Sequence, residues 1–404
     1  MHKYLYQYFK IILIFIITLT LTSCYQKSVA HYVNNKKNYQ ITNLNINQFN
    51  PSVTHCYQDG FNYYISGIND NGNIAGVITN FNPILNKCLN QGFLFNTDKV
   101  SPQFIDLPYP NIKSEPNSVV ITHLSNQNIS TGFSTYNQDI NYAIVNNETQ
   151  VKLISNNYSS TSYISANSNY IIYQPYFATN NSQLYNLITE STIQLKYKNS
   201  EQFSTTLIQV DNQGNSIGYA TELESDNHIM GIICHNNSKS NNCDPITADE
   251  SDHNIKLSHI ASNGLWIYGE EFNFTNPQHN IFLVDPITNK KIYPKELSNF
   301  IIDDDHNNIT DNGVMTIVKQ NQAERQFQYI YVPKQHKIYS IIALINSFST
   351  NLDLFGTTYL YLSTNGKYIY IANNPDFLHS VLGVKIYFQQ GLEEYLINNV
   401  KPYN

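Results

Sequence analysis

Charged residues and tryptophan are scarce in this sequence. Asp, Glu, Lys and Arg make up 13% of the 404 residues, and only one Trp is present. No Lys/Arg cluster follows the first ten residues, which argues against nucleic acid or anionic lipid headgroups as partners. The sequence also lacks G-x-S-x-G and H-E-x-x-H motifs, a phosphate-binding glycine loop and a Rossmann fingerprint. No motif therefore assigns a catalytic group, and we expect no cofactor.

Long hydrophobic runs are also rare, and the clearest one lies at the N-terminus. Lys3 and Lys10 precede the uncharged run Ile11–Thr22, which has 12 residues. A membrane-spanning helix needs roughly 20 residues, so this run is too short to cross a bilayer comfortably. Its length and its flanking residues are typical of the apolar region of a signal peptide.

The residues that follow predict where the signal peptide is cleaved. Leu21-Thr22-Ser23-Cys24 resembles the lipobox of bacterial lipoproteins, which implies that Cys24 becomes the lipidated first residue of the mature chain. Two or three acyl chains bind a membrane firmly, at ~0.8 kcal/mol per buried CH₂. Tyr25 after the cysteine implies the outer membrane, if the cell has one. An ordinary secretory signal or a short membrane anchor with a chance cysteine is the alternative.

Four cysteines remain in the mature chain. An even number in an exported protein predicts disulfides, and four cysteines allow three pairings among Cys56, Cys88, Cys234 and Cys243. Cys234 and Cys243 flank a polar loop that could fold back and bring them together. The alternative is a metal site using Cys234, His235 and Cys243, with His228 or His253 nearby, although zinc sites usually have closer cysteine pairs.

The residues that are abundant predict a β-rich chain. Tyr is the clearest example, with 32 copies, and Tyr, Ile, Thr and Val suit pleated strands, whereas Asn and Gly suit turns. In Tyr63–Ile78, two apolar runs flank Asn71-Gly72, a hairpin signal in which both turn residues are expected to have φ > 0. Gly92–Asn96 and Gln103–Leu107 are predicted to be the third and fourth strands of this unit.

The hairpin recurs along the chain. Equivalent turns contain Gly214, Gly264, Gly313 and Gly366, which lie 50, 49 and 53 residues apart, and weaker copies fill Leu124–Ile129 and Ile164–Tyr170. The closing strands of these units are predicted at Val151–Ile154, Ile193–Leu195, Lys291–Tyr293, Lys337–Ile341 and Glu393–Ile397. The chain therefore contains seven units of about four strands each.

Seven such units predict an all-β fold, a β-propeller with seven four-stranded blades. One small sheet exposes both faces, whereas stacking sheets in a closed ring buries them. We expect a signal peptide at 1–23, a flexible tether at 24–38 and one propeller at 39–404. Gln40–Leu44 could pair into the last blade and close the ring. The rival folds are a pair of β-sandwiches and an open array of hairpins, and only Ile341–Phe348 and Gly391–Val400 have some helical character.

The repeat resembles a known family. Ser66–Gly76, followed by Gly92–Asn96 and Phe104–Leu107, is similar to the HAF-type extracellular repeat of exported bacterial proteins, and Asp353–Ile369 looks like its closing repeat. The resemblance covers roughly residues 39–404. The glycine that usually follows the fourth strand is missing, and the second and third hairpins lack Asn-Gly. The family implies a propeller-like exported protein and brings no established activity.

Two weak candidates for a functional site stand out. Asp303, Asp305 and Asp311 could hold a divalent cation, but an EF-hand loop needs a Gly and a terminal Glu where Asn308 and Val314 stand. A solvated acidic cluster is the simpler interpretation. Trp266 could be a platform for sugars, although an aromatic residue at this spacing more often packs between blades.

Three classes of function are compatible with these features. The first is a binding or scaffold module of the cell envelope that holds a protein or glycan with the loops of the propeller. The second is an envelope enzyme, a lyase or hydrolase, with its site over the central channel. The third is a purely structural envelope protein. The absence of catalytic motifs favours the binding module.

The lipid anchor yields the first testable prediction. Replacing Cys24 with Ala should abolish labelling by a radioactive fatty acid and release the protein from the membrane fraction, because no acyl chain can then be attached. Ser23→Ala is the matched control, since it keeps a small residue before the cysteine and should leave labelling intact. Membrane retention and labelling of the Cys24→Ala protein would contradict the lipoprotein assignment.

Overall fold

The structure is a computed structural model. It describes residues 38–45, 63–82, 87–96, 103–106, 118–136, 140–146, 150–175, 181–197, 202–222, 228–236, 242–248, 253–274, 276–303, 309–320, 328–348, 352, 359–372 and 381–403. Cys24, Cys56 and Asp305 lie outside the described residues, as do the predicted signal peptide and nearly all of the tether. The assignments made for them stay predictions.

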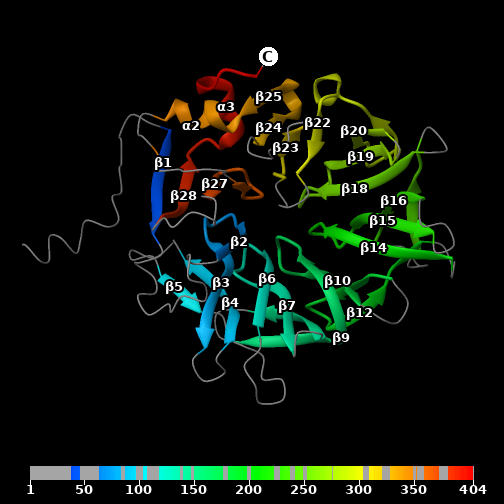
Figure 1. Ribbon diagram of the computed structural model, residues 1–404. Helices are drawn as coiled ribbons and strands as arrows, with labels where there is room; N and C mark the ends of the chain where they lie inside the picture. The colour runs from blue at the N-terminus through cyan, green and yellow to red at the C-terminus, as the bar shows by residue number, and fades with distance from the viewer. Residues whose placement is uncertain are drawn as a thin grey trace, which may run out of the picture.

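The described chain forms six hydrogen-bonded sheets that follow one another around a central axis (Figure 1). The first sheet contains β2 (Tyr63–Ile68), β3 (Ile74–Asn82), β4 (Lys87–Asn96) and β5 (Gln103–Asp106). The second contains β6 (Ser118–Leu124), β7 (Ser130–Tyr136), β8 (Ile140–Asn146), β9 (Val151–Ile164), β10 (Tyr170–Pro175), β11 (Gln183–Asn186) and β12 (Ser191–Gln194). This succession is an all-β propeller, which confirms the predicted fold class.

The remaining sheets complete the circle. The third contains β13 (Lys196–Tyr197), β14 (Phe203–Val210), β15 (Ser216–Glu222), β16 (Ile229–Cys234) and β17 (Asn242–Ile246). The fourth contains β18 (Asn254–Ile260), β19 (Ile267–Asn273), β20 (Asn276–Val284) and β21 (Lys291–Ile292). The fifth contains β22 (Phe300–Ile302), β23 (Met315–Lys319), β24 (Gln328–Val332) and β25 (Lys337–Ser340). The sixth contains β26 (Tyr359–Leu362), β27 (Tyr368–Ala372), β28 (Val381–Phe388) and β1 (Tyr39–Asn45).

The prediction of seven separate blades is wrong, because two predicted units share one strand. Strand β9 has 14 residues, and its first half pairs with β8 through Val151–Tyr158. Its second half pairs with β10 through Ser159–Ile164. The second and third predicted units are thereby joined into one sheet of seven strands. The described residues therefore form six sheets, although the seven hairpin turns that defined the repeat are all present.

The ring is closed by the N-terminal segment. Strand β1 pairs antiparallel with β28 from Tyr39↔Phe388 onward and forms the outer edge of the sixth sheet. The predicted closing role of Gln40–Leu44 is confirmed. The strand predicted at Glu393–Ile397 is wrong, because this segment is the helix α3 (Leu392–Asn399). Since β1 already occupies the edge of the sheet, the C-terminal segment packs beside it as a helix instead.

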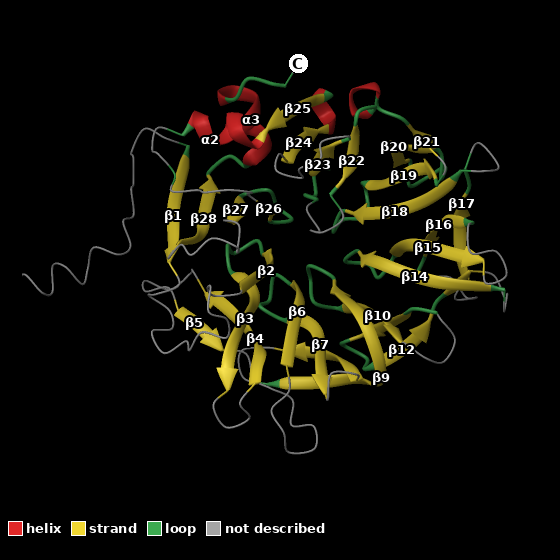
Figure 2. Cartoon of the chain, in the orientation of Figure 1, coloured by secondary structure: helices red, strands yellow, loops and turns green. Residues whose placement is uncertain are grey.

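Two short helices cover the junction of the fifth and sixth sheets (Figure 2). The helix α2 (Ile341–Ser347) begins where the Ser340 side chain accepts a hydrogen bond from the Ile342 amide, which satisfies one donor of the first turn. Both helices bury apolar side chains, including Leu344 and Leu396, in one cluster with the neighbouring strands. In the described residues no helix has the length and apolarity needed to cross a bilayer.

The hydrophobic core is divided into seven clusters among the described residues. Each cluster combines side chains from two consecutive hairpin units, and one of them joins the last unit to the first, as in the packing of Tyr361 and Tyr370 with Ile65 and Phe93. Buried aromatic side chains each remove roughly 150–250 Å² from water. The faces of each unit are therefore covered by its two neighbours around the whole circle.

Seven hairpin turns lie at the inner ends of the strands, and together we call them the hairpin ring. They comprise residues 69–73, 125–129, 165–170, 211–215, 261–266, 310–314 and 363–368, and each is closed by a bond from the fourth residue's amide to the first residue's carbonyl. Only the fourth residue of each turn has a positive φ. The prediction that both residues of Asn-Gly have a positive φ, in a two-residue turn, is therefore wrong. The first turn has the three-residue loop that combines a type I turn with a left-handed residue.

Neighbouring turns are bonded to each other in two alternating ways. In the first, third, fifth and seventh turns the third residue is Asn, and its side-chain amide donates to the carbonyl of the second residue in the next turn. These bonds join Asn71–Asn126, Asn167–Asn212, Asn263–Asp311 and Asn365–Asp70, at 3.0, 2.8, 2.8 and 3.3 Å. In the other turns a main-chain amide makes the link, in Asn126–Ala166, Asn212–Ser262 and Asp311–Thr364, at 2.9, 2.9 and 2.7 Å. The seven links close a complete circle.

Asp70 joins the last turn to the first and carries the only acidic side chain in the first turn. Its carboxylate accepts hydrogen bonds from Asn126 Nδ2 (2.7 Å), Thr364 Oγ1 (2.8 Å) and the Asn365 amide (2.7 Å). Removal of this acceptor leaves three donors without their partner, two of them on the opposite end of the chain.

We expect Asp70→Ala to lower the free energy of unfolding by about 2–4 kcal/mol, because hydrogen bonds to a charged acceptor contribute about 1.5–3 kcal/mol each and part of the loss is recovered by water. Urea denaturation followed by tyrosine fluorescence measures the change. Asp285→Ala is the control, since the Asp285 carboxylate accepts bonds only from Ile287 and Thr288 of its own hairpin. Equal losses in the two variants would show that ring closure is not the cause.

Candidate functional site

The central channel is lined by residues from all seven hairpin units and has a volume of about 50 Å³. Its polar lining includes Ser66, His123 and Tyr163, and the rings of His123 and Tyr163 lie 3.9 Å apart between centroids. Burial raises the pKa of Tyr163, and the nearby Asp311 carboxylate raises it further. A volume of this size holds one or two water molecules. It has no room for a sugar ring or a peptide.

A larger cavity of about 300 Å³ lies where α3 meets the hairpin ring, and we call it the α3 pocket. It is lined by residues of the sixth and seventh turns, by Lys334 of the 3₁₀-helix η3 (Pro333–Gln335) and by the start of α3. Its volume lies at the lower end of the range for ligand pockets, ~300–1,000 Å³. Of the two cavities described, only this one is large enough for a small ligand.

Main-chain hydrogen bonds fix the walls of the α3 pocket. The Leu392 amide donates to the Gly366 carbonyl at 2.7 Å, and the Phe388 amide donates to the Lys367 carbonyl at 2.8 Å. The N-cap residue of α3 is Gly391, with φ of 91°, and no side chain caps the helix. The helix therefore starts directly against the seventh turn, and its first residues face the cavity.

The charges around the α3 pocket balance. Lys334 and Lys367 face Glu393 and Glu394, and Lys334 Nζ lies 3.8 Å from Glu393 Oε2. This ion pair is partly exposed and contributes little to stability, about 0–1 kcal/mol. One oxygen of Glu394 accepts a bond from Asn398 at 2.8 Å. Lys367 and Glu394 are exposed, whereas the Glu393 side chain is only 18% exposed.

Three polar side chains of the α3 pocket make no hydrogen bond within the described chain. They are Asn312 in the sixth turn, Lys367 in the seventh turn and Gln390 before α3, and all three are exposed. The pocket floor is formed by buried residues, among them Val314 and Leu392. The site thus combines a small aliphatic floor with a rim of exposed donors and acceptors that water can reach.

Two of the three acidic residues predicted as metal ligands, Asp303 and Asp311, are bonded to different partners within the fold. Asp303 is buried and accepts a hydrogen bond from Gln328, whereas Asp311 belongs to the hairpin ring and accepts one from Ser262 Oγ at 2.5 Å. Burial raises the pKa of Asp311. Asp305 lies outside the described residues. In the described part of the chain no three His, Cys, Asp or Glu side chains are placed to hold a metal ion.

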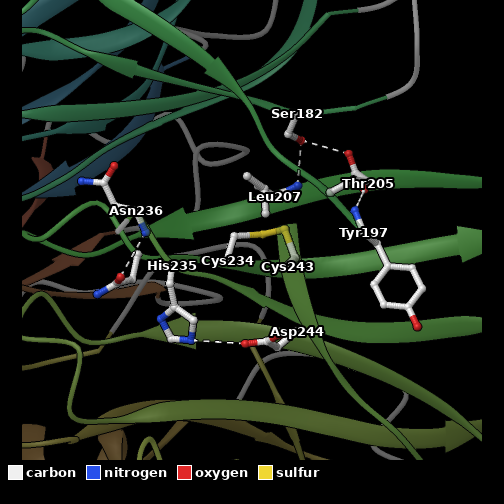
Figure 3. The surroundings of a disulfide bond; sticks show 10 residues. Ser182, Tyr197, Thr205, Leu207, Cys234, His235, Asn236, Cys243 and Asp244 are labelled. Carbon is white, nitrogen blue, oxygen red and sulfur yellow. Dashed lines mark hydrogen bonds and ion pairs between the residues drawn. A yellow bond between two sulfur atoms is a disulfide. The ribbon is translucent and has the colours of Figure 1, made fainter. Parts of the chain in front are cut away.

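Cys234 and Cys243 form a disulfide, as predicted (Figure 3). They face each other on the paired strands β16 and β17, with their Cα atoms 4.1 Å apart. Closing this short loop stabilises the fold by roughly 2.5–3 kcal/mol on the chain-entropy model. Both sulfurs are bonded, so they cannot serve as thiolate ligands of a metal with His235. Cys88 is also disulfide-bonded.

A buried ionic cluster in the fourth sheet escaped the sequence analysis. Glu271 on β19 accepts hydrogen bonds from Lys291 Nζ (2.8 Å) and from the Tyr293 hydroxyl, and His253 Nδ1 lies 3.1 Å away. Burial alone would raise the pKa of Glu271, but the bonds from Lys291 and Tyr293 hold it below its ordinary value. Neither cavity described above is lined by these residues. We interpret the cluster as a structural link from β21 to the middle of the sheet. The sequence feature that could have indicated it is Glu270-Glu271, two adjacent acidic residues within a strand.

Trp266 is a packing residue. It is partly buried against the core cluster of the fourth and fifth sheets, and its ring lies on Gly313 of the next turn, 2.4 Å from where a Cβ atom would be. Tyr368 covers Gly72 and Tyr170 approaches Gly214 in the same way. An aromatic residue at the end of one turn thus lies on the glycine of the next. This arrangement supports the packing interpretation of Trp266 over a sugar platform.

Comparisons with known proteins agree with the fold. No protein-family model and no curated protein matches the chain. Among solved structures it is similar to an oligogalacturonate lyase in complex with manganese (TM-score 0.52, 9% identity, 89% of this chain and 96% of that chain covered). It is also similar to the β-propeller domain of the Trilobed protease from Pyrococcus furiosus (TM-score 0.51, 10% identity, 80% and 95% covered). At these identities the likeness shows the propeller fold alone, and the resemblance to HAF repeats stays a prediction.

The packing of Trp266 is tested by two alanine substitutions at equivalent turn positions. Gly313 and Gly366 both have positive φ, but only Gly313 lies under an aromatic ring, whereas a Cβ at Gly366 would meet Thr310 at an ordinary 3.5 Å. Gly366→Ala should cost about 1–2 kcal/mol of unfolding free energy from backbone strain. Gly313→Ala should cost about 1–3 kcal/mol more, because the Trp266 ring must move. Equal costs in urea denaturation would contradict the proposed contact.

Proposed function

We propose that this protein is an exported lipoprotein, anchored to the envelope through Cys24, that acts as a binding module. The signal-like N-terminus and the Leu-Thr-Ser-Cys sequence support export and lipidation, and Tyr25 favours the outer membrane. The 15 residues from Cys24 to Asn38 would act as a tether that holds the propeller away from the bilayer. We expect two partners. One is the membrane, bound through the lipid on Cys24, and the other is an envelope ligand, either a protein or a glycan.

The observation that carries the binding role is the α3 pocket. It offers about 300 Å³ and polar side chains without internal partners, on elements fixed by main-chain hydrogen bonds. Ordered walls reduce the entropy that a ligand's binding must offset. A purely structural protein would have no need of such a site. We therefore place the ligand in the α3 pocket, at the side of the hairpin ring.

The alternative of an enzyme acting over the channel gains little from the described residues. The channel lining contains a single imidazole, His123, and no carboxylate or cation among the residues that the structure describes. General acid–base catalysis needs two titratable groups around a space that admits the substrate. The described channel holds two titratable side chains, His123 and Tyr163, but its volume of about 50 Å³ has no room for a substrate.

Blocking the pocket tests the proposal. Asn312→Trp places a large side chain at an exposed turn position on the pocket rim, and Gln127→Trp places one at the equivalent position of the second turn, away from the pocket. Full-length protein in mild detergent, immobilised and exposed to envelope extract, should retain a specific component in the wild-type and Gln127→Trp forms. The Asn312→Trp form should lose it. Unchanged retention by Asn312→Trp would refute the α3 pocket as the binding site.

A further inference from the structure

We infer that the α3 pocket binds a neutral sugar residue, such as the exposed end of an envelope glycan; this inference rests on the proposed binding function. The pocket volume of about 300 Å³ corresponds to roughly ten water molecules at ~30 Å³ each in the liquid. It therefore suits a ligand, or the end of a ligand, of one or two sugar rings. It is too small for a folded partner's loop to enter as a whole.

The balance of charge around the pocket selects against ions. Lys334 and Lys367 are matched by Glu393 and Glu394, so a ligand with net charge of either sign meets two like charges. The start of a helix attracts anions, but Glu393 and Glu394 occupy the first turn of α3 and oppose them. A uronate, a phosphate or an amine would each gain one favourable contact and lose another. A neutral ligand avoids this conflict.

The exposed polar groups of the rim match the hydrogen-bonding pattern of hydroxyls. Asn312 and Gln390 each present an amide that donates and accepts, Lys367 donates, and the glutamates accept. A sugar hydroxyl also donates and accepts, so neighbouring hydroxyls can bond to such a mixed rim without leaving a group unpaired. The aliphatic floor of Val314 and Leu392 offers a surface for the C–H face of a sugar ring.

A peptide is a poorer fit to the same walls. Extended peptides are usually bound by pairing with an exposed strand edge, or as an apolar helix face in a groove. The α3 pocket is lined by turns, a 3₁₀-helix and the first residues of α3, with no strand edge among the described lining residues. Its exposed rim is polar throughout. Saccharide hydroxyls are therefore the ligand chemistry that these walls recognise best.

The experiment is a titration of the detergent-solubilised full chain with a panel of small ligands. The panel contains methyl glycosides of neutral hexoses and of N-acetylated hexosamines, a methyl hexuronide, an unacetylated methyl hexosaminide and diglycine, and saturation-transfer NMR or calorimetry reports binding. At least one neutral glycoside should bind ten-fold or more tightly than its charged counterparts. Asn312→Ala and Gln390→Ala should each weaken it roughly 3- to 10-fold, as expected for one lost hydrogen bond. Gln127→Ala, at the equivalent turn position outside the pocket, should leave the affinity unchanged.

Each contrary outcome has a distinct meaning. Preferred binding of the uronide, the amine or diglycine, lost in Asn312→Ala, would overturn the neutral sugar while leaving the binding function in place. Glycoside binding that both alanine variants retain would overturn the pocket as its location. No binding of any panel member at tens of millimolar would overturn the inference. Unchanged capture by the Asn312→Trp form would refute the α3 pocket as the binding site, and capture of no specific component by the wild-type form would remove the binding function itself.

Discussion

The constraint on which this structure depends is the closure of a ring. Each hairpin unit exposes two apolar faces, and each of the seven core clusters combines side chains of two consecutive units. An open array would leave two faces in water, whereas a circle leaves none. The circle is closed twice, by β1 on the edge of β28 and by the hydrogen bonds of Asp70 with Thr364 and Asn365. Both closures join the beginning of the described chain to its end.

The parts of the fold that follow from local rules could be predicted. The spacing of Gly214, Gly264, Gly313 and Gly366 located four of the turns, because a left-handed residue there favours glycine. The second and third turns were faint because Asn128 and Ser168 adopt the same conformation, with φ of 60° and 66°. Asn128 accepts bonds from the side-chain amides of Asn69 and Asn73, and Ser168 bonds to Ser125. At three of the five glycine turns, those of Gly72, Gly214 and Gly313, an aromatic ring from the previous turn also approaches the glycine closely.

The parts that depend on partners distant in the sequence could not be predicted. Strand β9 runs through a polar segment with nothing in its sequence to show that two sheets share it, since the two partner strands decide this. The segment 393–397 has an apolar pattern compatible with a strand, although Gly391–Val400 also has some helical character. It is helical in a fold where β1, more than 340 residues earlier, takes the edge position. The α3 pocket was missed for the same reason. Its lining comes from segments near residues 312, 334, 366 and 392, which only the closed ring brings together.

The hairpin ring also explains why the pocket lies beside the sixth turn. In the odd-numbered turns the third residue is Asn, and its side-chain amide donates a hydrogen bond to the next turn. These side chains are therefore already used in linking the turns. In the even-numbered turns a main-chain amide makes the bridge, so the third side chain is released from that role. Asn312 is the third residue of the sixth turn, and α3 starts beside it. A ring held partly by its main chain thus leaves the Asn312 side chain, next to a lysine and two glutamates, without a role in linking the turns.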